Sequence, residues 1–153
     1  MRKVKKGEIL QRKGDMNSKV YIVDQGLLRS YIIDEKGKEH IYMFGSENWI
    51  VADNCEQGAP CQLYIDAIED SNIREILKED LMMGNPDLHA ISRRLNAMQV
   101  RILLLMSSSA RERYEHFLQT YPDIIQRVPQ RMIASYLGIT PEALSRVRKG
   151  MFR

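Results

Sequence analysis

Apolar and polar residues alternate with a period of two through much of the first half of the chain, which predicts β-strands. Clusters of glycine, aspartate and lysine interrupt the alternation at intervals of about ten residues, as in an antiparallel sandwich or barrel. The predicted strands cover residues 8–10, 20–23, 27–33, 40–44, 63–68 and 73–77. A loop with at most one helical turn is expected over residues 45–62, which contain the only tryptophan, Trp49.

From residue 78 onward, apolar residues recur with the period of an α-helix, about 3.6 residues. Short helices are predicted over residues 79–83, 110–119 and 123–127, and a long helix over residues 86–108. Apolar residues of the long helix follow the alternating three- and four-residue spacing of a coiled-coil heptad. We predict a parallel homodimer through this seam, and packing of the helix against its own β-domain is the alternative. The predicted dimer interface consists of Leu88, Ile91, Leu95, Met98, Ile102 and Leu105.

Residues 130–149, QRMIASYLGITPEALSRVRK, have the pattern of a helix-turn-helix. Ala134 is small where a second helix must cross, and Gly138 supplies the positive φ angle that ends the first helix. Thr140 is a suitable N-cap for the second helix, and Pro141 suits its first position. The agreement of these positions predicts a module that reads DNA, with an ordinary helical hairpin as the alternative.

The charge near the C-terminus supports the same interpretation. Residues 127–153 carry six cations and one anion, in a chain whose total net charge is +3. A basic patch of this kind favours contact with phosphate, although a solvated basic tail has the same composition. In the second helix we expect Leu144 and Val147 to be buried. The residues expected to face outward are Glu142, Ser145, Arg146 and Lys149.

Particular contacts to double-stranded DNA can be predicted for this module. Arg146 is the candidate for a bidentate contact to guanine, and Glu142 for accepting a hydrogen bond from the amino group of cytosine. In a dimer, two recognition helices about 34 Å apart would read a palindromic site. Phosphate contacts are expected from Gln130, Arg131, Thr140, Ser145 and Lys149.

Composition and length exclude several other classes of protein. The chain of 153 residues, with 44% hydrophobic and 28% charged residues, has the composition of a soluble globular protein. No apolar run approaches the roughly 18 residues of a membrane span. The basic start has no apolar segment behind it, so no signal peptide is predicted and we expect a cytoplasmic protein without a membrane partner.

Neither a metal site nor a catalytic site is predicted. Cys55 and Cys61 are the only cysteines, too few for a zinc or iron–sulfur site within one chain, and we expect them to be free thiols. His40, His89 and His116 fall on a strand and two different helices, so they do not indicate the metal cluster of a cupin. We therefore predict no catalytic residue, no metal and no cofactor.

Together these segments resemble the Crp/Fnr family of bacterial transcription regulators over almost the whole chain. The matching residues lie in segments 6–8, 14–15, 21–26, 34–39 and 69–71, in the long helix and in segment 131–149. The resemblance implies an α+β fold in three parts. They are an antiparallel, jelly-roll-like β-roll similar to a cyclic-nucleotide-binding domain (residues 1–85), a dimerisation helix (86–108) and a C-terminal helix-turn-helix module that binds DNA (109–153).

The resemblance also bears on individual residues and partners. The family's recognition helix commonly carries Glu-x-x-Ser-Arg, and Glu142, Ser145 and Arg146 stand at those places. Residues 47–49 are similar to those of a Bacteroidetes-type subgroup. RNA polymerase is implied as a further partner.

Two departures from the family limit what the resemblance implies. The segment from Glu39 to Ile73 holds seven acidic residues and no lysine or arginine, whereas cyclic-nucleotide binders place an arginine on the phosphate. Glu47 is a candidate for the glutamate that holds the ribose, but no arginine follows it before Arg74. We therefore expect no binding of cyclic AMP or cyclic GMP in the usual manner, and the effector is not identified. The chain also begins near its first strand and ends four residues after Lys149, so we expect a naturally short or truncated form.

The sequence as a whole thus predicts a dimeric, sequence-specific DNA-binding regulator. The alternative is a ligand-binding β-roll whose helical tail contacts another protein. A steeply salt-dependent affinity for DNA would separate the two hypotheses, because phosphate binding releases counterions.

Overall fold

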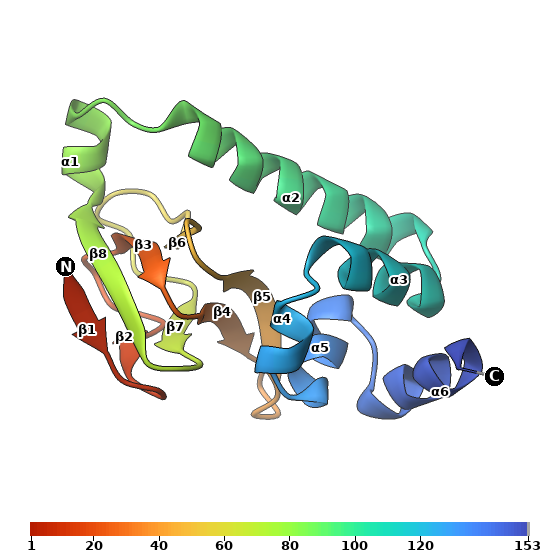
Figure 1. The fold of residues 1–153 in the computed structure, drawn as a ribbon. Helices are drawn as coiled ribbons and strands as arrows, with labels where there is room; N and C mark the ends of the chain where they lie inside the picture. Colours follow the sequence, from red (N-terminus) through yellow and green to blue (C-terminus); the bar gives the residue numbers. More distant parts are fainter. Residues whose placement is uncertain (153) are drawn as a thin grey trace. The chain divides into compact units, whose positions relative to one another are not determined.

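The computed structural model describes residues 1–152 and contains two compact units. The first unit covers Met1–Arg94 and the second begins at Leu95, so their boundary falls within the long helix α2 (Leu88–Ser107). Antiparallel strands make up most of the first unit and helices make up the second, which confirms the predicted α+β fold class (Figure 1). Among the described residues, no helix has the length and apolar character needed to cross a membrane.

Within residues 1–94, two four-stranded antiparallel sheets form a β-roll. One sheet has the strand order β1-β8-β3-β6 and the other has the order β2-β7-β4-β5. Strands from the start and the end of the unit therefore pair with each other, as in a jelly roll. The short helix α1 (Lys78–Met83) follows β8. The strands are β1 (Arg2–Val4), β2 (Ile9–Gln11), β3 (Lys19–Gln25), β4 (Leu28–Ile33), β5 (Glu39–Gly45), β6 (Ile50–Ala52), β7 (Tyr64–Ala67) and β8 (Ser71–Leu77).

The hydrophobic core of the β-roll draws side chains from both sheets. In β3, Tyr21 and Val23 are buried, whereas Ile22 between them is only partly covered, as the period of two requires. Leu10 and Trp49 pack against the same cluster from its edge. The fully buried members are Val4, Tyr21, Val23, Leu28, Val51, Ile65, Ala67 and Ile73.

A buried ion pair joins strands of the second sheet. Arg29 on β4 binds Asp66 on β7 with two hydrogen bonds, Nε to Oδ1 at 2.8 Å and Nη2 to Oδ2 at 2.9 Å. Glu39 on β5 accepts from the same guanidinium group at 2.5 Å. Burial acts to lower the pKa of Arg29, but the hydrogen bonds to these carboxylates outweigh it and raise the pKa above its usual value. The guanidinium group therefore stays charged and links three neighbouring strands.

The second unit packs its helices around one apolar core. Helix α3 begins with a capping box, in which the Ser109 side chain accepts from the Glu112 N–H at 3.2 Å and the Glu112 carboxylate accepts from the Ser109 N–H at 2.7 Å. This cap confirms the predicted break after the long helix. The helices are α3 (Ala110–Thr120), α4 (Ile124–Arg127), α5 (Gln130–Leu137) and α6 (Pro141–Met151). The buried apolar side chains are Tyr114, Phe117, Ile124, Val128, Ile133, Ala134, Leu137 and Leu144.

The structure corrects two details of the strand prediction. Residues 50–52 were expected to lie in a loop, but they form β6 and pair with β3, with Val20 opposite Ala52. The first strand, β1, was not predicted and pairs with β8. Both strands are three residues long. That length is too short for a visible alternation, so distant partners rather than local pattern define them.

Candidate nucleic-acid interface

Helices α5 and α6 meet at Gly138, which has the left-handed conformation that the sequence predicted, with φ 68° and ψ 31°. Its N–H donates to the carbonyl of Ser135 at 3.1 Å, and the N–H of Ile139 donates to the carbonyl of Ala134 at 3.0 Å. These bonds complete the C-cap of α5. The positive φ angle favours glycine here, and a Cβ atom at Gly138 would also lie 3.0 Å from Cδ2 of Leu105, so the Leu105 side chain would have to shift.

The start of α6 follows directly from its sequence. The Thr140 Oγ1 accepts a hydrogen bond from the N–H of Ala143 at 3.1 Å, and Pro141 occupies the first turn. Glu142 lies near the positive end of the helix dipole. Leu144 is 1% exposed and anchors the helix in the core, so the opposite face of α6 is directed outward.

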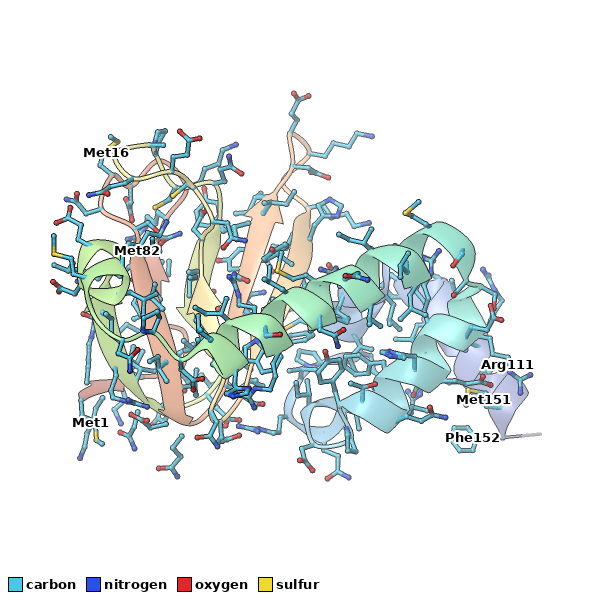
Figure 2. The ribbon with its side chains drawn as sticks, turned by 90° about the horizontal axis from the view of Figure 1, so that it is seen from above. Met1, Met16, Met82, Arg111, Met151 and Phe152 are labelled. Carbon is cyan, nitrogen blue, oxygen red and sulfur yellow. The ribbon has the colours of Figure 1, made fainter. Side chains whose placement is uncertain are left out.

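Polar side chains line this outward face. Val147 and Arg148, on the other side of the helix, are half-buried. The C-terminal end of α6 leads to Phe152, which is 80% exposed (Figure 2). Four predicted contact residues are exposed at helical spacing and form what we call the α6 stripe: Glu142, Ser145, Arg146 and Lys149.

Three exposed cations of α5 and α6 have no acidic partner among the described residues. Within residues 1–152, no acidic side chain forms an ion pair with Arg131, Arg146 or Lys149. Gln130 and Arg131 are exposed in the first turn of α5. The Thr140 hydroxyl accepts a hydrogen bond as N-cap, yet its own O–H can still donate. The module thus presents cations and donors that can bind an anion.

Arg113 on α3 links the ends of two other helices. Its Nε donates to the carbonyls of Leu104 and Ser108, both at 3.1 Å, and its Nη2 donates to the carbonyl of Leu105 at 2.9 Å. Its Nη1 donates to the carbonyl of Leu137 at 3.1 Å. The carbonyls at the C-terminal ends of α2 and α5 carry the negative ends of the helix dipoles. The Leu104 carbonyl also accepts from the N–H of Ser108 at 3.0 Å. One guanidinium group therefore binds both helix ends.

Arg101 makes a second link between α2 and α5. Its Nη2 donates to the backbone carbonyl of Tyr136 at 2.9 Å, and its guanidinium carbon lies 4.2 Å from the centroid of the Tyr136 ring. Burial raises the pKa of the Tyr136 phenol, whose ring also packs against Phe117 and Tyr121. This contact could not be predicted from the sequence because its partners are 35 residues apart.

The predicted dimer seam presents an apolar stripe on α2. Leu88, Leu95 and Ile102 are 71%, 59% and 54% exposed, and Leu105 is 38% exposed. Ile91 and Met98 are half-buried. Exposure of large apolar side chains to water is unfavourable in free energy. Burial of this stripe against a partner is therefore favoured.

The candidate effector residue Glu47 lies beside the turn between β3 and β4, and its Oε1 accepts from the N–H of Gly26 at 2.9 Å. Arg94 at the boundary of the first unit reaches the following segment, where it donates to the carbonyl of Ala52 at 2.7 Å and to Oδ1 of Asn54 at 2.9 Å. Burial lowers the pKa of Arg94. This arginine was not predicted as a site residue because it lies on the long helix, 42 residues from Ala52.

Residues 1–83, more than half of the chain, match the cyclic nucleotide-binding domain family. A β-roll of that family followed by a helix-turn-helix is the architecture of a transcription regulator and not of an enzyme. Over 163 residues the chain is 31% identical to the regulatory protein HlyX of Actinobacillus pleuropneumoniae. The aligned region covers 94% of this chain and 68% of the relative's length. The chain belongs to the Crp/Fnr family of transcription regulators.

Two further relatives agree with this assignment. The fumarate and nitrate reduction regulatory protein of Vibrio cholerae is 29% identical over 166 residues, which cover 94% of this chain and 65% of the relative's length. A solved CRP/FNR-family transcriptional regulator of Thermus thermophilus has a TM-score of 0.74 at 17% identity, with 99% of this chain and 85% of that chain covered. The structural likeness shows the fold alone.

The role of Arg113 can be tested by unfolding the full chain in urea. We expect Arg113→Gln to lower the free energy of unfolding of the helical unit by about 2–3 kcal/mol, because charge-assisted bonds to helix ends are lost. Circular dichroism at the helix band measures that unit, and fluorescence of Trp49 measures the β-roll and should not change. Arg111→Gln is the matched control, since Arg111 is exposed and pairs only with Glu115, so it should cost at most about 0.5 kcal/mol. Equal losses in the two variants would contradict the assigned role.

Proposed function

We propose that the protein is a dimeric, sequence-specific DNA-binding regulator of transcription. In this proposal residues 1–85 form a regulatory β-roll, residues 86–108 dimerise, and residues 109–153 bind DNA. The observation that carries the proposal is the α6 stripe, whose two cations are exposed and lack acidic partners among the described residues. RNA polymerase is the further partner on which such a regulator acts.

The α6 stripe supports a specific mode of recognition. A helix anchored by Leu144 can enter the major groove with its opposite face toward the base edges. There Arg146 donates two hydrogen bonds to guanine, and Glu142 accepts one from a cytosine amino group. Phosphate contacts fix the register and come from Gln130, Arg131, Thr140, Ser145 and Lys149.

A homodimer explains the exposed seam of α2. Two parallel copies of the helix would bury the large apolar side chains against each other, each contributing about 1.5–3 kcal/mol when fully covered. The two-fold axis would place two copies of α6 in successive major grooves about 34 Å apart. The proposed operator is therefore a palindrome.

The charges of the β-roll support a regulator that does not bind cyclic nucleotides in the usual manner. A phosphate ligand needs a free cation, and the nearby arginines are committed to other groups. Arg29 is paired with Asp66. Arg74 binds Asp24 at 2.9 Å. Arg94 donates to the backbone carbonyl of Ala52, so this arginine too is committed to the protein.

The dimer seam is tested by sedimentation of Leu95→Asp. A charge at this central heptad position should convert the dimer into monomers, because the partner helix would bury an unpaired carboxylate. Asn96→Asp adds the same charge one residue away on the exposed outer side and should leave the dimer intact. A Leu95→Asp protein that still sediments as a dimer would show that the heptad assignment is wrong.

Recognition of DNA sequence by α6 is tested on a site selected from random DNA with the purified protein. Arg146→Ala should weaken binding to that site by about 1–3 kcal/mol and relax specificity at one base pair. Lys149→Ala should weaken binding to all DNA sequences equally. It should also reduce the slope of log affinity against log salt concentration by about one. Lys36→Ala, an exposed cation in the turn after β4, is the control and should change neither. Equal losses for Arg146→Ala on selected and random DNA would make Arg146 a phosphate contact. A wild-type protein without salt-dependent DNA affinity would favour a tail that binds protein.

The effector prediction is tested by calorimetry with cyclic AMP. Because Arg29, Arg74 and Arg94 are committed to other groups, we expect the dissociation constant to be weaker than about 1 mM. Glu47→Ala should then give the same weak titration as the unchanged protein. Tight binding that disappears in Glu47→Ala would show that the roll binds cyclic nucleotides through this glutamate.

A further inference from the structure

Two cysteines come together in the loop that follows β6, away from the α6 stripe. The sulfur atoms of Cys55 and Cys61 and a carboxylate oxygen of Asp53 all lie within 4.8 Å of one another. Cys61 is 3% exposed, whereas Cys55 is half-buried. The two thiols are therefore neighbours with different access to solvent.

Backbone hydrogen bonds hold both cysteines in place. The N–H of Cys61 donates to the carbonyl of Asp15, and its carbonyl accepts from the N–H of Gly14, both at 2.8 Å. The N–H of Cys55 donates to Oδ1 of Asp53 at 2.9 Å. The fold thus keeps the sulfurs close without a covalent bond.

A cation lies directly beside Cys55. The Nζ of Lys78, the first residue of α1, donates to the Cys55 carbonyl at 2.9 Å and is 3.4 Å from its Sγ. A positive charge at this distance stabilises an anionic sulfur, which is the nucleophilic form of cysteine. Lys78 also lines a hollow of about 400 Å³ together with Ser18, Glu56 and Gln57.

The same cluster is poorly suited to a metal ion. The Oδ2 of Asp53 already accepts from the side chain of Gln11 at 3.3 Å and from the N–H groups of Gln62 and Leu63 at 2.6 and 2.7 Å. A metal would also have to approach the sulfur beside the Lys78 ammonium group, which repels it. Thiol oxidation meets neither obstacle.

We propose that Cys55 and Cys61 form a peroxide-oxidisable dithiol that closes to an intramolecular disulfide. The Cys55 thiolate attacks one oxygen of hydrogen peroxide, an S–O bond forms, the O–O bond breaks, and the leaving hydroxide takes up a proton to become water. Cys61 then attacks the sulfenic sulfur, the S–S bond forms and the S–O bond breaks. The hydroxide leaves as a second water with the proton of Cys61. Two electrons pass from the thiols to the peroxide.

The environments of the two thiols fit these roles. Burial raises the pKa of Cys61, so this thiol stays protonated and shielded until its partner is oxidised. Cys55, with Lys78 beside it and greater access, reacts first. Closing the disulfide brings the sulfurs to about 2.05 Å.

The proposal is tested on the reduced full chain with small excesses of hydrogen peroxide at neutral pH. After alkylation and digestion, mass spectrometry should find Cys55 joined to Cys61 in one chain, with both thiols lost together and recovered by dithiothreitol. Exposed methionines such as Met16 and Met82 (Figure 2) serve as internal references and should be oxidised more slowly. Fluorescence of Trp49 checks that the β-roll stays folded.

Variants separate the roles of the residues. Cys61→Ser should leave Cys55 as a sulfenic acid that dimedone traps, and Cys55→Ser should leave Cys61 unmodified at the same dose. Lys78→Met should slow thiol loss by about tenfold or more, whereas Lys19→Met, which removes a nearby cation paired with Glu75, should not.

Four results would overturn the proposal. They are a disulfide between two chains in place of the intramolecular one, oxidation of Cys61 before Cys55, an unchanged rate in Lys78→Met, and protection of both thiols by one zinc ion per chain in an anaerobic titration. The last would make the cluster a metal site.

Discussion

The helix-turn-helix depends on the hydrogen bonds that the guanidinium group of Arg113 donates to the ends of two helices. The C-terminal ends of α2 and α5 both direct carbonyls toward this group, and two negative dipole ends would otherwise repel each other. Arg101 adds a second cation at the carbonyl of Tyr136 and packs on its ring. With α5 held in this way, the turn at Gly138 sets the direction of α6, and the α6 stripe is presented as one rigid surface.

In the β-roll, several charged groups are paired or hydrogen-bonded inside the protein, whereas the cations of the α6 stripe are exposed. Arg29 and Asp66 neutralise each other inside the sheet, and Asp53 is 2% exposed and holds the loop after β6 through its carboxylate. Groups committed to structure are not available to a phosphate ligand, whereas the cations of the α6 stripe are. The same loop brings Cys55 and Cys61 together.

Much of the helical half could be predicted from the sequence because helix signals are local. The heptad spacing of α2, the left-handed Gly138, the Thr140 cap and the outward position of Arg146 each depend on residues within about two turns. The strand order of the roll could not be predicted in this way, and β6 was mistaken for a loop, since a three-residue strand is defined by its partner.

The sequence by itself therefore determined the fold class, the turn between α5 and α6 and the composition of the α6 stripe. Only the tertiary structure decided which polar side chains form hydrogen bonds within the protein. Arg113 reaches Leu137 across 24 residues, Arg101 reaches Tyr136 across 35, and Lys78 reaches Cys55 across 23. No local period encodes such contacts, because chain segments that pack against each other are brought together by burial of the core and not by their spacing in sequence.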